Sequence, residues 1–210
     1  KNDLIQEDMR ASYGKIPESD GRSQEEKEEK LVKLYLKRLK EIVPSRGGRP
    51  RTVSVPILKP TIDRTLYHLV YLTRHAKGIT VFMEASEKLN LVQCRTRAQA
   101  KQKKREDKSG QRELFSSADW MPMEKHADLA EVKLYWLGRL KNSPCQFGIE
   151  ELADMLEEST WFEGDLQVAF GELEKEGKVK NLDANRKRRS KFVHFSENHG
   201  KGENLVKVLS

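Results

Sequence analysis

The sequence predicts a mixed helix-and-strand chain in two parts, an α/β unit followed by a helical unit that ends in a hairpin. Two observations support this fold class. In the first half, a helical repeat of apolar residues gives way to two strand-like runs and then to another helix. In the second half, three short amphipathic segments precede two short strand-like runs. The 210 residues suffice for one large or two small domains.

The composition is highly charged and basic. Charged residues make up 35% of the chain, and the formal net charge of +7 favours an anionic partner, with nucleic acid, DNA first, as our expectation. The two cysteines, at 94 and 145, have no CxxC neighbour, so we expect no metal site and a reduced, cytoplasmic setting. No apolar run reaches the roughly 18 residues of a membrane span, so we expect no membrane partner.

The first half begins with residues 1–23, which are polar and interrupted by glycine and proline, and which we expect to be a flexible segment. A helix is predicted from residue 24, because Ser23 and Glu26 have the spacing of a capping box and apolar residues then recur every three or four positions. Pro44 and the following glycine pair end this helix.

Two strands and a second helix follow. The alternating, β-branched run 51–58 predicts a strand at a sheet edge or bulge, and the more continuously apolar run 65–75 predicts a buried strand. Gly78 then opens a helix. Arg74 and His75 stand at the exit of the predicted buried strand, where sites gather in α/β folds, which makes them weak catalytic candidates beside a structural interpretation.

Residues 93–125 form a basic linker between the two parts, which we place at 24–92 and 126–198. Its charge predicts either a solvated helix or a flexible tether. The charge of this linker has two interpretations. It could simply keep a tether soluble, or it could contact the backbone of DNA or RNA. The candidates for that contact are Lys101, Lys103, Lys104 and Arg105.

The second part has the order of a winged helix-turn-helix domain. Three predicted helices precede Gly177, which is a plausible C′ glycine, and the runs "KVKNL" and "KFVHF" predict the two strands of a wing. Residues 199–210 are then a C-terminal tail. Winged helices bind DNA or RNA and also serve as protein-docking modules, so the fold alone does not assign a function.

Charge placement within this domain favours the wing over the third helix as a binding element. The third helix is acidic and would be repelled in a major groove, although Gln167 could reach a base. The wing cations could neutralise phosphates without sequence choice. Two alternatives remain open, protection of an edge strand and contact with an acidic protein. The wing cations are Arg186, Lys187, Arg188, Arg189 and Lys191.

The segment "LYHLVYLTRHAKG", followed by a helix, resembles the three-Cys-motif partner proteins, a bacterial family with a methyltransferase-like amino-terminal domain. The resemblance covers residues 24–90, and the carboxyl-terminal winged helix of that family matches residues 126–198 more loosely. The positions that match the family pattern are Tyr67, Leu69, Tyr71, Thr73, Arg74, His75 and Gly78.

The resemblance implies that residues 24–92 are the last elements of a Rossmann-like methyltransferase domain. The early strand and glycine-rich turn that would hold S-adenosylmethionine are missing from this sequence, so we expect no cofactor in this chain and S-adenosylmethionine only in a longer protein. Three functions remain: binding of the nucleic-acid backbone beside a methyltransferase-like unit, part of such an enzyme, or docking of a partner protein encoded nearby. Whether the chain is an enzyme is left open.

Overall fold

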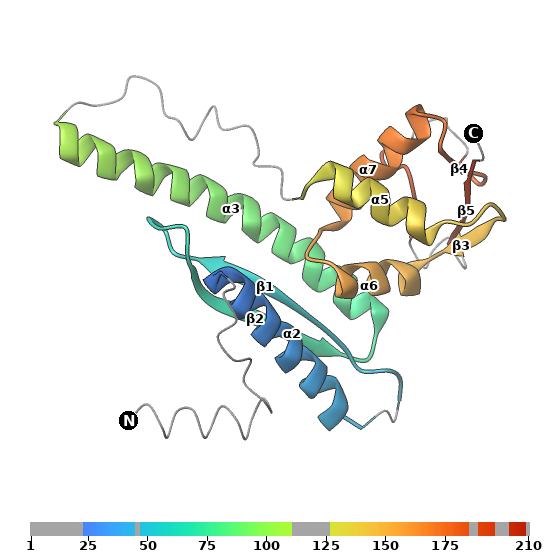
Figure 1. The fold of residues 1–210 in the computed structure, drawn as a ribbon, viewed down its shortest axis with the longest axis horizontal. Helices are drawn as coiled ribbons and strands as arrows, with labels where there is room; N and C mark the ends of the chain where they lie inside the picture. Colours follow the sequence, from blue (N-terminus) through green and yellow to red (C-terminus); the bar gives the residue numbers. More distant parts are fainter. Residues whose placement is uncertain (1–22, 45–46, 111–126, 185–188, 196–201, 209–210) are drawn as a thin grey trace.

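The computed structural model describes residues 23–44, 47–110, 127–184, 189–195 and 202–208. Figure 1 shows a first part made of two helices and a hairpin, and a second part of three helices and a small sheet. The elements are α2 (Gln24–Ile42), β1 (Arg51–Leu58), β2 (Thr65–Thr73), α3 (Ala76–Ser109), α5 (Leu129–Arg139), β3 (Cys145–Phe147), α6 (Ile149–Glu158), α7 (Glu163–Lys175), β4 (Val179–Asn181) and β5 (Glu203–Lys207).

In the first part, α2 and α3 lie on opposite faces of an antiparallel hairpin of β1 and β2. The predicted capping box at the start of α2 is confirmed. On one face, His68 of β2 bonds Glu28 of α2 at 2.8 Å. On the other, Tyr71 stacks on Phe82 of α3 with ring centroids 4.8 Å apart. Since successive side chains of a strand point to opposite faces, over 67–73 the even-numbered side chains of β2 face α2 and the odd-numbered ones face α3.

β2 is a strand, as predicted, but it is not buried. The side chains of Leu66 and Tyr67 are 55% exposed, whereas Val53 and Val55 of β1 are buried. The prediction assumed that a continuously apolar run has neighbouring strands on both sides. Among the described residues β2 pairs only with β1, so it is an edge strand. A doubly wound parallel sheet, and with it the methyltransferase-like domain, is not confirmed.

Helix α3 continues far beyond the predicted domain boundary. Its 34 residues run without a break through 93–109, so this stretch of the predicted linker is the solvated helix of the two alternatives. Figure 1 shows this end of α3 projecting away from the rest of the molecule. The helix ends at Gly110, whose φ of 69° is the left-handed conformation typical of a C-terminal glycine. The rest of the predicted linker, 111–125, lies outside the described residues.

The second part packs α5, α6 and α7 around a core centred on Trp136. The indole N–H of Trp136 donates to the Leu166 carbonyl at 3.0 Å, and its ring lies 5.2 Å from that of Phe170 and 5.5 Å from that of Phe147. The sheet beside this core has the strand order β3-β5-β4. Three helices with a strand between the first two, followed by a strand pair, confirm the predicted winged-helix architecture.

The second strand of the wing is β5, at 203–207, and not 191–195 as predicted. The stretch that was predicted as a tail therefore supplies the central strand of the sheet. Residues 191–195 have no regular structure, although Val193 and Phe195 are buried in the core. Both segments are short and mix polar with apolar residues, so periodicity alone does not distinguish them. Residues 1–22 and 196–201, which include other parts of the predicted termini, lie outside the described residues.

Candidate nucleic-acid interface

Helix α7 occupies the position of the helix that enters the major groove in DNA-reading relatives of this fold. Most of its surface is covered. Only Val168 and Lys175 of its thirteen residues are exposed. At its start, the carboxylate of Glu87 of α3 lies against Gly164. A helix enclosed in this way offers little surface to a groove.

Residues 189–195, which we name the covering segment, lie along α7. The Gln167 side chain accepts the backbone N–H groups of Phe192 and Val193 at 2.9 and 3.0 Å and donates to the Val193 carbonyl at 2.6 Å. The ring of Phe192 rests on Gly171, with no space for a Cβ between them. Gln167, which was predicted to reach a base, instead holds the covering segment in place.

Two wing cations turn toward acids of the protein itself. Arg189 donates to both carboxylate oxygens of Glu203 at 2.7 Å, and Lys191 contacts Glu163 of α7 at 2.6 Å. Their ion pairs anchor the start of the covering segment to β5 and α7, so the charges of these two cations are already paired within the protein. The remaining wing cations, Arg186, Lys187 and Arg188, lie outside the described residues.

Glu203 is the polar centre of this anchor. Burial would raise the pKa of its carboxyl, but hydrogen bonds from Arg189, from the backbone N–H of His194 and from the Asn181 amide outweigh burial and lower it. A lowered pKa means that the anchor stabilises the fold above the carboxyl's unfolded value of about 4.3 and weakens as the pH falls through the folded value.

The outer half of α3 carries a row of cations on one face. Arg97, Lys101, Lys104 and Lys108 follow one another at spacings of four, three and four, which aligns them over about 16 Å of helix. Arg97 and Lys101 bind Asp63 at the hairpin tip, with the Lys101 ammonium 3.1 Å from a carboxylate oxygen. These bonds, that from Lys101 first, lower the pKa of Asp63.

Beyond this clamp, the cations of α3 face solvent. Lys103, Lys104 and Lys108 are exposed and make no ion pair with another described residue. Arg105 is also exposed on this part of the helix. The structure thus brings the candidates on α3 together on one projecting element, where they are accessible to a polyanion.

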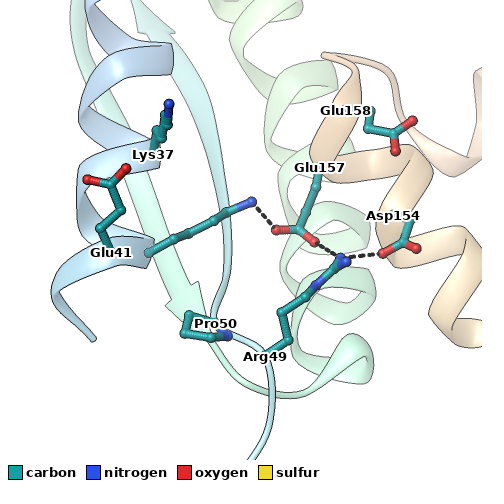
Figure 2. Close-up of a pocket in the computed structure, with 8 residues that line it drawn as sticks. Lys37, Glu41, Arg49, Pro50, Asp154, Glu157 and Glu158 are labelled. Carbon is teal, nitrogen blue, oxygen red and sulfur yellow. Dashed lines mark hydrogen bonds and ion pairs between the residues drawn. The ribbon is translucent and has the colours of Figure 1, made fainter. Parts of the chain in front are cut away.

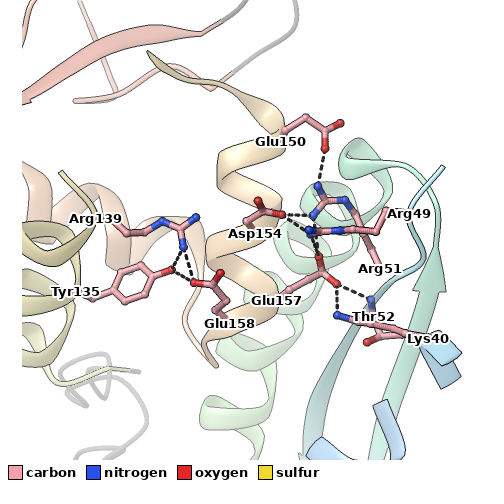
Figure 3. A network of polar contacts seen from close by, with 10 residues as sticks. All are labelled: Lys40, Arg49, Arg51, Thr52, Tyr135, Arg139, Glu150, Asp154, Glu157 and Glu158. Atoms are coloured by element: carbon pink, nitrogen blue, oxygen red, sulfur yellow. Dashed lines mark hydrogen bonds and ion pairs between the residues drawn. The ribbon is translucent and has the colours of Figure 1, made fainter. Parts of the chain in front are cut away.

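A buried ion network, which the sequence did not reveal, joins the two parts of the molecule (Figure 3). Arg51 of β1 and Glu157 of α6 are only 5% and 4% exposed, and their charged groups are 2.7 Å apart. Glu157 also accepts from the Thr52 N–H at 2.8 Å and contacts Lys40 at 2.7 Å. Further carboxylates and cations of the network are Glu150, Asp154 and Arg49.

This network lines a cavity of about 530 Å³ between α2 and α6, shown in Figure 2. Arg49 reaches Asp154 at 2.6 Å and Glu157 at 3.2 Å, while Lys40 reaches Glu157 from the other side. The charged groups that line the cavity are paired with one another. We therefore interpret it as part of the contact between the two parts of the molecule, and not as a binding site.

The two weak catalytic candidates have structural surroundings. Arg74 donates to the backbone carbonyl of Pro44 at 3.0 Å, which ties the end of β2 to the end of α2. His75 is the N-cap residue of α3, but its side chain does not cap the helix. The described residues contain no group of three His, Cys, Asp or Glu that could hold a metal ion.

Comparison with known proteins supports the fold of the second part. Residues 101–186 match the family model of the GMT-like wHTH domain, from the outer end of α3 through β4 into the wing. This part is a winged helix-turn-helix domain. Neither the curated proteins nor the solved structures give a match to the chain. No helix in the described ranges is long and apolar enough to cross a membrane.

Proposed function

We propose that this chain binds the nucleic-acid backbone, DNA first, through cations that lie outside α7. The observation that carries the proposal is the group of accessible cations on the outer half of α3, where Lys103, Lys104 and Lys108 face solvent. Ammonium groups gathered on one projecting element neutralise phosphates and release counterions, which favours binding without sequence choice. A winged-helix domain beside this helix is consistent with a nucleic-acid partner.

The covered state of α7 supports backbone contact over base contact. A base-reading helix must place several side chains in the major groove. Here the covering segment lies along α7, and its backbone occupies the side chain of Gln167. Val193 and Phe195 belong to the core, so the covering segment cannot leave α7 without opening that core. Binding should therefore depend weakly on sequence.

The exposed cations of α3 are tested by replacing Lys103, Lys104 and Lys108 together with alanine. We expect affinity for a fluorescently labelled duplex to fall about tenfold at low salt, and the slope of log affinity against log salt to become shallower by roughly 2 to 3, since each phosphate contact contributes about 0.9. Duplexes of unrelated sequence should be affected alike. Fluorescence anisotropy at several salt concentrations measures both quantities.

The matched control replaces Lys27, Lys33 and Lys37 of α2, which removes the same charge from exposed positions on another helix. If the control weakens binding as much as the α3 variant, net charge and not the placement of the α3 cations is responsible. Replacement of Arg186, Lys187 and Arg188 tests the wing contribution in the same assay. Absent or salt-insensitive binding by the unaltered protein contradicts the proposal.

Docking of a partner protein is the second candidate function. The ion pairs between two wing cations and acids of the same chain favour it. Arg189 and Lys191 bind acids of their own chain, and α7 is enclosed, as expected of a winged helix that does not use its DNA-reading surface. A partner encoded nearby would then contact other surfaces of the domain. The titration above separates the two candidates, since a docking module has no salt-dependent affinity for duplexes.

We also propose that the first part belongs to a methyltransferase-like unit. The order of helix, two strands and helix supports this, as do helices on both faces of the hairpin. The cofactor-holding strand and turn would come from a longer protein or a partner. Calorimetry with S-adenosylmethionine should give no heat with this chain and a saturable signal with the longer protein or the complex. No signal from either of these contradicts the enzymatic assignment.

A further inference from the structure

The outer edge of β2 exposes apolar side chains on both faces of the sheet. Leu66, at the register shift, is 55% exposed and Leu72, on the side of α2, is 38% exposed, while Tyr67 and Leu69, on the side of α3, are 55% and 41% exposed. No residue from 65 to 73 is Lys, Arg, Asp, Glu or Pro. Natural edge strands normally carry charge, proline or a bulge that prevents pairing. This stretch has neither charge of that kind nor proline, and the register shift in its pairing with β1 lies at its start, at Leu66, which leaves 67–73 regular.

The backbone of this edge is also available for pairing. In an antiparallel pair, half of the N–H and C=O groups of each strand point away from the partner. Among the described residues, only β1 pairs with β2, over Arg51–Leu58, so the outward groups of β2 meet no other strand of this set. A nine-residue apolar edge with such groups is a template for another strand.

The sequence of β2 is close to a palindrome about Leu69. It reads TLYHLVYLT, and an antiparallel copy centred on Leu69 pairs nearly every residue with its own kind. Like apolar, aromatic and Thr side chains directly opposite one another stabilise a sheet. The opposed residues are Thr65 and Thr73, Leu66 and Leu72, Tyr67 and Tyr71, His68 and Val70, and Leu69 with itself.

We propose that two copies of this chain pair β2 to β2 in antiparallel fashion about a two-fold axis at Leu69. The product is a four-stranded sheet in the order β1-β2-β2-β1. Such an isologous contact requires a self-complementary surface, which the near-palindrome provides. The stretch is free of formal charge apart from His68, which faces Val70 and not its own copy, so the two-fold axis opposes no like charges.

The size of the contact sets its strength. With about 200 Å² for a fully exposed Tyr or Leu residue, the four exposed side chains of both copies offer about 750 Å², before the strand backbones are counted. This places the contact among the smaller specific interfaces, of about 1,200 Å² or less, for which we expect a dissociation constant of about 1–100 μM.

Light scattering after size exclusion tests the dimer directly. We expect a mass near the 24.3 kDa monomer at about 0.1 μM and near twice that value at about 500 μM. Leu69→Lys places two like charges opposite each other at the axis and should weaken association at least tenfold. Leu134→Lys, at a 70% exposed position on α5, is the matched control and should leave association unchanged.

A charge exchange tests the register. Leu66→Lys and Leu72→Glu should each weaken the dimer, whereas the two changes in one chain place opposite charges across the axis and should restore part of the association. Circular dichroism confirms that each variant folds. A single mass at all concentrations, indifference to Leu69→Lys, or a double variant no better than the singles overturns the proposal. A monomer would leave the edge to a strand of another protein or of a larger sheet.

Discussion

Replacement of Glu157 by leucine is expected to lower the free energy of unfolding by about 3–5 kcal/mol. The carboxylate accepts from Arg51, Lys40 and the Thr52 N–H, and both Glu157 and Arg51 are almost fully buried. Removing one partner of a buried pair leaves the other desolvated and incompletely compensated. Asp154 still contacts Arg51 at 2.6 Å, but the Thr52 N–H loses its side-chain acceptor.

The matched control is Glu150→Gln. Glu150 binds the same guanidinium at 2.5 Å from the same helix, but its side chain is 65% exposed, so the change should cost about 1 kcal/mol or less. Urea denaturation of both variants gives the comparison. Equal losses for the two variants would mean that burial does not set the strength of this network.

The consequence of this network is the fixed placement of the two parts. Helix α6 packs against α3 and β1, and the ion pairs lie on the side of α6 that faces β1. Because Arg51 and Glu157 are 106 positions apart in sequence, no local pattern could have revealed their contact. Composition shows how many charges a chain has, and only the fold shows which of them meet.

Elements with strong local signals were predicted well. The capping box at Ser23 and Glu26 fixed the start of α2, and Gly177 marked the turn after α7. The order of helices and strands in 126–181 was sufficient for the winged-helix assignment, because each apolar stripe there is short and clearly bounded. The position of β2 was also correct, but its burial depends on strands that the periodicity of one run cannot supply.

The candidate site was predicted less well, because charge position along a chain does not give side-chain direction. Arg189 lies 14 residues from Glu203, and only the fold shows that the two side chains meet. Gln167 was expected to reach a base if the acids of its helix pointed away, yet its amide binds the backbone of the covering segment. The cations of α3 are more accessible because this end of the helix projects from the molecule.

The second large expected loss of stability is at Gly202, next to the wing strand that was predicted at 191–195 and lies at 203–207. This residue precedes β5, has a φ of 92°, and packs so closely on β3 that an added Cβ would contact the Phe147 carbonyl and lie 2.5 Å from the Gly148 Cα. Gly202→Ala should therefore lower the free energy of unfolding by about 3 kcal/mol or more, combining backbone strain with displacement of β3 from β5.

Gly177→Ala separates these two causes. Gly177 also has a positive φ, of 72°, but a Cβ there meets nothing within 4 Å, so its change should cost only about 1 kcal/mol. Thermal and urea unfolding of both variants measure the difference. Similar losses at the two glycines would mean that the contact with β3 is not tight. A larger loss at Gly202 would instead show that this close approach holds 203–207, and not 191–195, beside β3 in the sheet.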